Sequence, residues 1–292
     1  MNDHGGILVT AANGRTGRAV IAALSRRGAR PRAFIRDEAQ WPALEALGAA
    51  DHAVGDLLDP ATIVRALQGC AAIVYIGPPM HPEETRMAGH CLAAAASAGV
   101  RAFVYYSVMH PIRREVRHHR LKLEAEELVV ESGLPYTIVQ PIRYMQHLEP
   151  IWRTVMDAGV HAMPFNTHVK FSVVDLADLA DATAIVSTDA AHRYATYELA
   201  GPEPLSQEDM ARIISGVLGR TVVAGEVPIA TLQARARASG ASEDRVEQMT
   251  IMNRHYDRHG FLGNPNVLRM LLGREPTPFR EYVTKLNKRT RG

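Results

Sequence analysis

The sequence predicts an α/β protein with a doubly wound parallel sheet in residues 1–141 and a smaller, mostly helical C-terminal lobe in residues 142–292. A short apolar run at residues 7–10 meets a small-residue turn and then a helical pattern, which is typical of a strand, a tight loop and a helix. Further apolar runs alternate with helical patterns as far as residue 141, which favours parallel strands joined by helical crossovers. Beyond that residue the alternation lapses, so the second lobe is expected to cover the sheet's ligand crevice.

Composition and charge exclude several classes of protein. The chain has 292 residues, of which 47% are hydrophobic and 22% charged, and a net charge of only +2, so it is expected to be globular, with no nucleic-acid or membrane partner. Its two cysteines, Cys70 and Cys91, fit small buried hydrophobes in a reducing compartment. No secretory signal pattern opens the sequence, and the small-apolar run at residues 91–100 is too short to span a bilayer. We expect a cytoplasmic protein with a small-molecule substrate; a homo-oligomer is left open.

The loop at residues 11–17 is the main candidate for cofactor binding. Its small residues Ala11, Gly14 and Gly17 permit a sharp turn, a close approach of a pyrophosphate to backbone N–H groups, and tight packing of the next helix, residues 15–27. The helix N-terminus adds unpaired N–H donors and the positive end of a dipole. An ordinary strand-to-helix turn is the alternative. The loop residues expected to contact the cofactor are Ala11, Asn13, Gly14, Arg15, Thr16 and Gly17.

A second strand at residues 31–37 ends in Arg36 and Asp37, about twenty residues after the loop, where dinucleotide folds read the adenosine ribose. An Arg there pairs with a 2′-phosphate, whereas an acid accepts from a free 2′-hydroxyl. We assign Arg36, with help from Arg15, to the 2′-phosphate, which predicts NADP, with NAD as the alternative. Asp37 is expected to cap the helix that follows rather than to bind ribose.

The third strand, residues 51–54, is followed by Asp56 and Leu57, which would meet the adenine. The same residues also read as a plain loop before a helix that starts at Asp59-Pro60. Both interpretations stay open.

The later strands end near the same crevice. The apolar run 71–76, which is typical of a central strand buried on both faces, breaks at Gly77-Pro78. Helices are expected at 40–47, 83–98 and 115–132, and strands at 101–107 and 135–140. Because ligands bind at the carboxyl ends of parallel strands, further cofactor contacts are expected at Gly77, Pro78, Pro141 and Tyr144.

The C-terminal lobe is expected to begin with a helix at 144–158. The other expected elements are a strand at 169–173, a helix at 175–187 capped by Asp175, a strand at 194–200 that can return to the main sheet, a helix at 206–218 with Ser206 and Asp209 as a capping box, and helices over 228–288 broken near 240, 260–263 and 276–278.

Taken together, these phrases resemble the NmrA-like branch of the atypical short-chain dehydrogenase/reductases. The resemblance rests on the opening loop, Asp56-Leu57, Lys122 in RLKLE, SGLPYTIVQP at 132–141, FSVVDLAD at 171–178 and YELAGP at 197–202. It implies a Rossmann core that binds NADP or NAD. Some members reduce quinones, dyes or benzylic ethers, and others are redox-sensing regulators without catalysis. Ala11 departs from the family's usual first Gly, and Gln140 from an Arg that many relatives carry.

The resemblance directs attention to Lys122, which matches the lysine that family reductases use to contact the ribose or to act as general acid/base. The Tyr-x-x-x-Lys pair of ordinary short-chain dehydrogenases is missing from the sequence; instead His118 precedes Lys122 by one helical turn and could donate a proton. A solvated charge run at 113–120 is the alternative. Ser107 lies at the end of the strand expected at 101–107, where it would polarise a substrate or satisfy a turn.

A metal site is not expected. His255 and His259 recur at helical spacing beside Tyr256, but no carboxylate is evidently placed to join them, which favours a packed helix with polar edges.

These features predict an NADP(H)-dependent oxidoreductase that transfers hydride to a small carbonyl, quinone or conjugated substrate, with Lys122 or His118 as the proton source. Two alternatives are a non-catalytic NADP(H)-sensing regulatory protein and a non-redox isomerase or dehydratase. The basic run 113–122 could instead hold an anionic substrate or an acidic partner.

Overall fold

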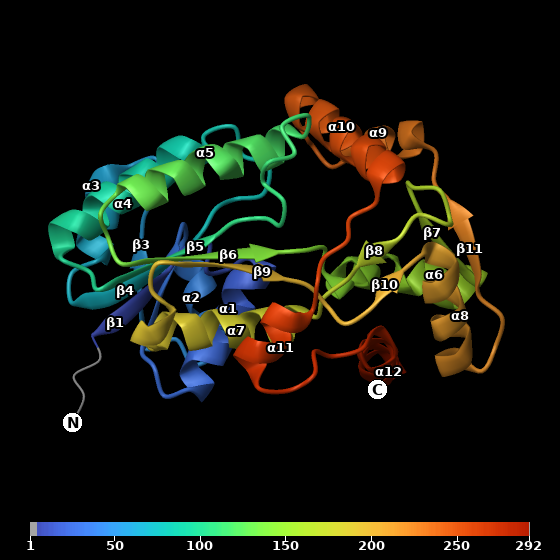
Figure 1. Cartoon of the computed structure of the whole chain (residues 1–292), viewed down its shortest axis with the longest axis horizontal. Coiled ribbons are helices and arrows are strands. Elements are labelled where there is room, and N and C mark those ends of the chain that lie inside the picture. Colours follow the sequence, from blue (N-terminus) through green and yellow to red (C-terminus); the bar gives the residue numbers. More distant parts are fainter. Residues whose placement is uncertain (1–4, 292) are drawn as a thin grey trace. The chain divides into compact units, whose positions relative to one another are not determined.

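The computed structural model describes residues 5–291, which divide into two compact units (Figure 1). The first unit contains residues 5–112, His119–Pro141 and Leu179–Tyr197, and the second contains Arg113–His118, Ile142–Asp178 and residues 198–291. The boundary expected at residue 141 is therefore one of several points at which the chain passes from one unit to the other.

A seven-stranded sheet forms the centre of the first unit, in the order β3-β2-β1-β4-β5-β6-β9. Its strands are β1 (Gly6–Val9), β2 (Pro31–Ile35), β3 (Asp51–Val54), β4 (Cys70–Ile76), β5 (Ala102–Tyr106), β6 (Tyr136–Pro141) and β9 (Ala195–Leu199). Every pairing from β3 across to β6 is parallel, which confirms the predicted fold class. The strand order reverses between β1 and β4, the switch point where doubly wound sheets bind ligands. The expected strand at 194–200 does return to this sheet, as β9.

Helices cover both faces of the sheet. They are α1 (Arg15–Arg26), α2 (Trp41–Glu45), α3 (Pro60–Ala66), α4 (Glu84–Ala98), α5 (Arg117–Glu131) and α7 (Leu176–Thr188), with short 3-10 turns η1 (Glu38–Gln40) and η3 (Ala190–His192). In Figure 1, α3, α4 and α5 lie along one face, and α1, α2 and α7 along the other. Leu8, Tyr75 and Phe103 are buried in the core beneath α3 and α4, together with Cys70 and Cys91, so both cysteines are the buried hydrophobes that were predicted.

The second unit contains two small sheets and most of the remaining helices. Its elements are η2 (Met145–Ile151), α6 (Trp152–Ala158), β7 (Val160–Met163), β8 (Phe171–Ser172), β10 (Pro204–Leu205), α8 (Gln207–Leu218), β11 (Val223–Glu226), α9 (Ile229–Ala238), α10 (Glu243–His259), α11 (Asn266–Leu272) and α12 (Phe279–Arg291). Strand β11 pairs with β7 in parallel, and β10 pairs with β8 in antiparallel orientation. Among residues 5–291, no helix is both long and apolar enough to cross a membrane.

Three expectations for the second unit needed correction. The helix expected at 144–158 is a 3-10 segment followed by the short α6, because Pro150 lies inside η2 and cannot donate a backbone hydrogen bond. The strand expected at 169–173 shortens to Phe171–Ser172. Strands β7, β10 and β11 were not expected at all. The predicted capping box is confirmed: the backbone N–H of Asp209 donates to Ser206 Oγ at 3.1 Å, and that of Ser206 donates to the Asp209 carboxylate at 3.0 Å.

Candidate functional site

The loop between β1 and α1 has the geometry of a phosphate cradle. Ala11 adopts the left-handed conformation with φ of 46°, and its carbonyl oxygen accepts from the N–H of Gly14 at 2.9 Å. A Cβ on Gly17 would lie 2.4 Å from that same carbonyl oxygen, so only glycine lets α1 pack this closely on the loop. Helix α1 begins at Arg15 with no side-chain cap from Gly14, which leaves N–H donors at its N-terminus for an anion.

The two charged residues after β2, Arg36 and Asp37, differ in their surroundings. Asp37 is the N-cap of η1, because its carboxylate accepts from the backbone N–H of Ala39 at 2.9 Å, as predicted. Arg36, which directly follows β2, is exposed. In the loop, Arg18 donates to the backbone oxygen of Asn13 at 3.0 Å and also to its side chain, which holds that part of the turn. These residues fit a dinucleotide carrying a 2′-phosphate; the assignment of Arg36 to that phosphate stays a prediction.

The residues after β3 already make contacts within the protein. Asp56 accepts from the backbone N–H of Leu58 at 2.8 Å, and Leu57 is buried in the core of the first unit. Helix α3 starts at Pro60 with Asp59 as its cap. The loop interpretation therefore accounts for these residues, and an adenine contact by Asp56 and Leu57 stays a prediction.

A buried ion pair lies behind the end of β4. Lys122 Nζ donates to Glu84 Oε1 at 2.7 Å and to the backbone oxygen of Tyr106 at 2.9 Å, and the Tyr105 hydroxyl donates to the same Glu84 oxygen at 2.9 Å. Lys122 is 4% exposed and Glu84 is 2% exposed. A Cβ on Gly77 would lie 2.1 Å from the Glu84 carboxylate, so the glycine that directly follows β4 makes room for this pair. Pro78 follows it and is half-buried.

A second buried carboxyl, that of Glu126 on α5, lies near Ser107, the residue after β5. Glu126 accepts from Gln140 Nε2 at 2.9 and 3.0 Å, and its burial raises the pKa of the carboxyl, partly opposed by hydrogen bonding and by the charge of Lys122. Ser107 is 5% exposed, and its hydroxyl lies close enough to Glu126 that hydrogen bonding between them acts to lower the pKa of that carboxyl. The first unit thus holds a buried carboxyl with a raised pKa beside the Ser107 hydroxyl.

Sequence reasoning identified Lys122 and Ser107 but missed Glu84 and Glu126. The signal for Glu126 was its position one helical turn after Lys122, on the face of α5 that packs on the sheet. Glu84 could not be found in this way, because its partner lies 38 residues further along the chain.

The remaining predicted residues lie close to points where the chain passes from one unit to the other. His118 and Tyr144 belong to the second unit, where both are half-buried, and Pro141 is the buried last residue of β6 in the first unit. Tyr144 bridges to Val174 and stacks on His147 with ring centroids 5.8 Å apart. The roles predicted for His118 and Tyr144 stay predictions.

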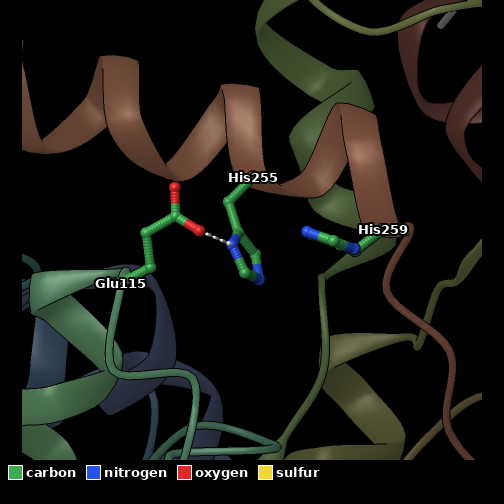
Figure 2. A group of neighbouring side chains, drawn as sticks. All are labelled: Glu115, His255 and His259. Carbon is green, nitrogen blue, oxygen red and sulfur yellow. Dashed lines mark hydrogen bonds and ion pairs between the residues drawn. The ribbon is translucent and has the colours of Figure 1, made fainter.

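The histidines of α10 do have a carboxylate neighbour, contrary to expectation. Figure 2 shows the His255 ring between Glu115 and His259, and His255 Nδ1 lies 3.0 Å from a Glu115 oxygen. The ligand atoms of all three residues lie within 4.8 Å of one another. Arg258 also binds the Glu115 carboxylate at 2.5 Å, so a guanidinium already holds the charge that a metal ion would need. The sequence argument failed because Glu115 lies 140 residues before His255.

Known proteins share both the sequence pattern and the fold. The NmrA-like family model matches residues 3–283. The chain is 31% identical over 217 residues to the NAD(P)H azoreductase of Xenophilus azovorans, covering 74% of this chain and 75% of the relative. It is 24% identical over 282 residues to quinone oxidoreductase 2 of Escherichia coli, covering 96% and 98%.

Solved structures agree in fold. The NADPH complex of an Escherichia coli NADPH-dependent quinone oxidoreductase gives a TM-score of 0.83 at 24% identity, covering 96% of this chain and 99% of the other. The NADP(H) complex of Citrobacter sp. triphenylmethane reductase gives 0.82 at 23% identity, covering 96% and 99%. Since the family model spans nearly the whole sequence and the sheet has the expected order, this chain belongs to the NmrA-like family.

Proposed function

We propose that this protein is an NADP(H)-dependent reductase that transfers hydride to a small carbonyl, quinone or conjugated substrate. The observation that carries the proposal is the β1–α1 loop, where Gly17 packs against the Ala11 carbonyl and the start of α1 is left for an anion. The relatives named azoreductase and quinone oxidoreductase support reduction as the reaction class.

A preference for NADP over NAD is supported by the end of β2. Arg36 is exposed there, while Asp37, the acid that would bind a free 2′-hydroxyl, is engaged as the cap of η1. An exposed guanidinium suits a 2′-phosphate because its forked donors match two phosphate oxygens.

The bound nicotinamide supplies the hydride, and the chain's own residues must orient it and supply a proton. Lys122 is suited to positioning, because Glu84 and the backbone of Tyr106 fix its ammonium at the carboxyl end of β5. The Ser107 hydroxyl is suited to polarising a substrate oxygen, and the nearby Glu126 carboxyl, whose pKa is raised by burial, is suited to supplying a proton. His118 remains the alternative proton source.

A non-catalytic NADP(H) sensor is the second candidate. One observation favours it: the ammonium of Lys122 is already bound by a carboxylate and a carbonyl oxygen, as in a purely structural ion pair.

A titration of the protein with NADPH and NADH, followed by nucleotide fluorescence, tests the proposal when azo and quinone acceptors are then added. We expect tight NADPH binding, weaker NADH binding, and oxidation of NADPH on addition of an acceptor. Arg36→Ala should remove the preference without preventing NADH binding. Binding without turnover on any acceptor would favour the sensor, and absence of binding would contradict both candidates.

Lys122 needs a paired test, because Lys122→Met alone would leave the buried Glu84 carboxylate unpaired and cost about 3–5 kcal/mol of stability. The double variant Glu84→Gln/Lys122→Met removes both charges, so we expect it to regain most of that loss in urea denaturation. If the double variant is stable and binds NADPH but has lost most of its turnover, the positioning role is supported. Unchanged turnover in the double variant would assign the pair to stability alone.

A further inference from the structure

The second unit contains a pocket with an uncompensated cation. Its lining comes from η2 and the residues before it, from β7, β8, α8 and α12, and consists of Arg143, Tyr144, Met145, His147, Leu148, His161, Met163, Phe165, Phe171, Val173, Gln207, Met210 and Phe279. The enclosed volume is about 30 Å³, room for roughly two water molecules or for one carboxylate-sized group, and the pocket opens to solvent. All of these residues belong to the second unit.

Arg143 is the only cation of the lining that is charged at every ordinary pH. Its guanidinium carbon lies 5.1 Å from the Phe165 ring centroid and 5.3 Å from that of Phe171, and its Nη2 approaches Met163 Sδ at 3.7 Å. Burial lowers the pKa of Arg143 to about 10, so it stays protonated at neutral pH. Within residues 5–291 it forms no ion pair with a carboxylate.

Aromatic faces alone do not replace the hydration that this guanidinium has lost. Cation–π contacts stabilise the charge through the flat faces of the guanidinium, but they accept no hydrogen bond from its five N–H donors. The Met163 sulfur is only a weak acceptor. Arg143 is half-buried and the pocket opens to solvent, so its remaining N–H donors are within reach of an anionic group with oxygen acceptors.

Two neutral side chains in the same lining also have unmet hydrogen-bonding capacity. His161 Nδ1 and Gln207 Oε1 are buried and have no partner within the described residues. Burial lowers the pKa of His161 to about 4, so its ring is neutral and does not compete for an anion with Arg143. Gln207 Nε2 donates to the backbone oxygen of Phe165 at 2.5 Å, which leaves Oε1 as an acceptor for a donor group on a ligand.

We propose that this pocket binds the carboxylate or sulfonate of an aromatic substrate, with Arg143 as the residue that selects for the negative charge. The anion would enter the pocket and face the guanidinium, and the substrate's ring would stay outside this small volume, beside the half-buried Tyr144. A single guanidinium matches a monoanion better than a phosphate dianion, because it supplies one charge and one forked pair of donors. This inference rests on the proposed function only in naming the ligand as the substrate to be reduced.

Binding without turnover tests the pocket independently of catalysis. Isothermal titration of the protein with 1-naphthoate and with the neutral 1-naphthylmethanol compares one ring system with and without the charge. We expect naphthoate to bind at least about 10-fold more tightly than the alcohol. Arg143→Gln should weaken naphthoate binding about 10- to 100-fold and leave the alcohol within about 2-fold, whereas Arg143→Lys, which keeps the charge, should recover part of the affinity.

Arg153→Gln is the matched control, because Arg153 lies in the same unit but is exposed and pairs with Asp157. It should bind naphthoate like the unaltered protein. Equal binding of the two ligands, or unchanged naphthoate binding by Arg143→Gln, would overturn the inference. The comparison of ligands on the unaltered protein decides the matter even if Arg143→Gln does not fold.

The turnover arm uses NADPH oxidation with 1,4-naphthoquinone and its 2-sulfonate. We expect a lower KM for the sulfonate, and a selective rise of that KM in Arg143→Gln. If naphthoate binds through Arg143 but neither quinone is reduced, the anion pocket stands and the proposed reductase function fails. If both quinones are reduced with equal KM and naphthoate does not bind, the reductase function stands and the pocket assignment fails.

Discussion

At the scale of single residues, Ala11 stands out because it holds a backbone conformation that suits glycine. With φ of 46°, its Cβ is crowded against the following carbonyl, which costs an L-residue roughly 1–2 kcal/mol. The loop closes in spite of this cost because Gly14 and Gly17 both pack on the Ala11 carbonyl oxygen.

Ala11→Gly should relieve this strain. Part of the gain is offset by the greater backbone freedom of glycine in the unfolded chain, so we expect a net increase of about 0.5–1 kcal/mol in the free energy of unfolding. Urea denaturation without nucleotide measures it, and an NADPH titration shows whether the cradle also binds more tightly. The control is Ala12→Gly, at a fully buried neighbour outside the left-handed region, which should destabilise. Destabilisation by both substitutions would contradict this account.

The raised pKa of Glu126 predicts how the free energy of unfolding changes with pH. Because its pKa is raised in the folded protein, folding favours the protonated carboxyl. Its stabilising contribution is therefore complete below the unfolded value of about 4.3 and is lost as the pH rises through the raised folded value.

Glu126→Gln imitates the protonated form at every pH. We expect it to raise the free energy of unfolding, relative to the unaltered protein, more at pH 7 than at pH 4.5, as measured by urea denaturation at both values. Glu127→Gln, at an exposed position on the same helix, should show little change between the two. A difference that grows on acidification would show that the sign is wrong.

At the scale of elements, the approach of α1 to the β1 loop depends on Gly17. A Cβ there would meet the Ala11 carbonyl oxygen at 2.4 Å and the Ala12 Cα at 2.7 Å, and both are backbone atoms that cannot move aside cheaply. The helix and the loop must therefore separate if any larger residue is introduced.

Gly17→Ala is expected to lower the free energy of unfolding by about 1–3 kcal/mol and to weaken NADPH binding, because it displaces the helix N-terminus. The matched control is Gly89→Ala in α4, where the added Cβ would lie 4.0 Å from Leu128. That control should stabilise by up to about 1 kcal/mol through helix propensity. Denaturation curves and nucleotide titrations of the two variants give the comparison, and equal behaviour would refute the steric argument.

Elements with strong local signals could be predicted from the sequence. Strand β3 has the predicted bounds, and α8 has its predicted capping box, because periodicity and cap residues act within a few positions. Strands β7 and β11 escaped prediction, since each has only four residues and is defined by its partner 63 positions away in the sequence, as in Val160 with Val223. The same limit hid Glu84 and Glu115, whose partners are supplied by distant segments.

At the scale of the whole molecule, the two units are interleaved along the chain. Residues 179–197 supply most of α7 and the start of β9 to the first unit. There Arg26 pairs with Asp181 at 2.8 Å, and the Thr137 hydroxyl donates to the His192 carbonyl at 2.8 Å. The first unit is thus incomplete at residue 141, even though the family's cofactor loop and six strands of its sheet lie before that point.

A fragment of residues 1–141 should therefore fail to fold cooperatively, because it lacks α7 and leaves the edge of β6 unpaired. Joining residues 179–197 to it through a flexible linker should recover a cooperative thermal transition that shifts upward with NADPH, by an amount equivalent to about 2.7 kcal/mol at one hundred times the dissociation constant. A cooperative, NADPH-responsive transition in the shorter fragment would refute the claim.

The same interleaving constrains folding during synthesis. A ribosome adding about 5–20 residues per second needs roughly 3–11 s to pass from the end of β6 to the end of the segment that supplies β9. Throughout that interval the nascent sheet has an open edge at β6. Co-translational chaperones and the pace of translation across residues 142–197 therefore become determinants of yield, and synonymous changes in that stretch would affect how much protein reaches the native state.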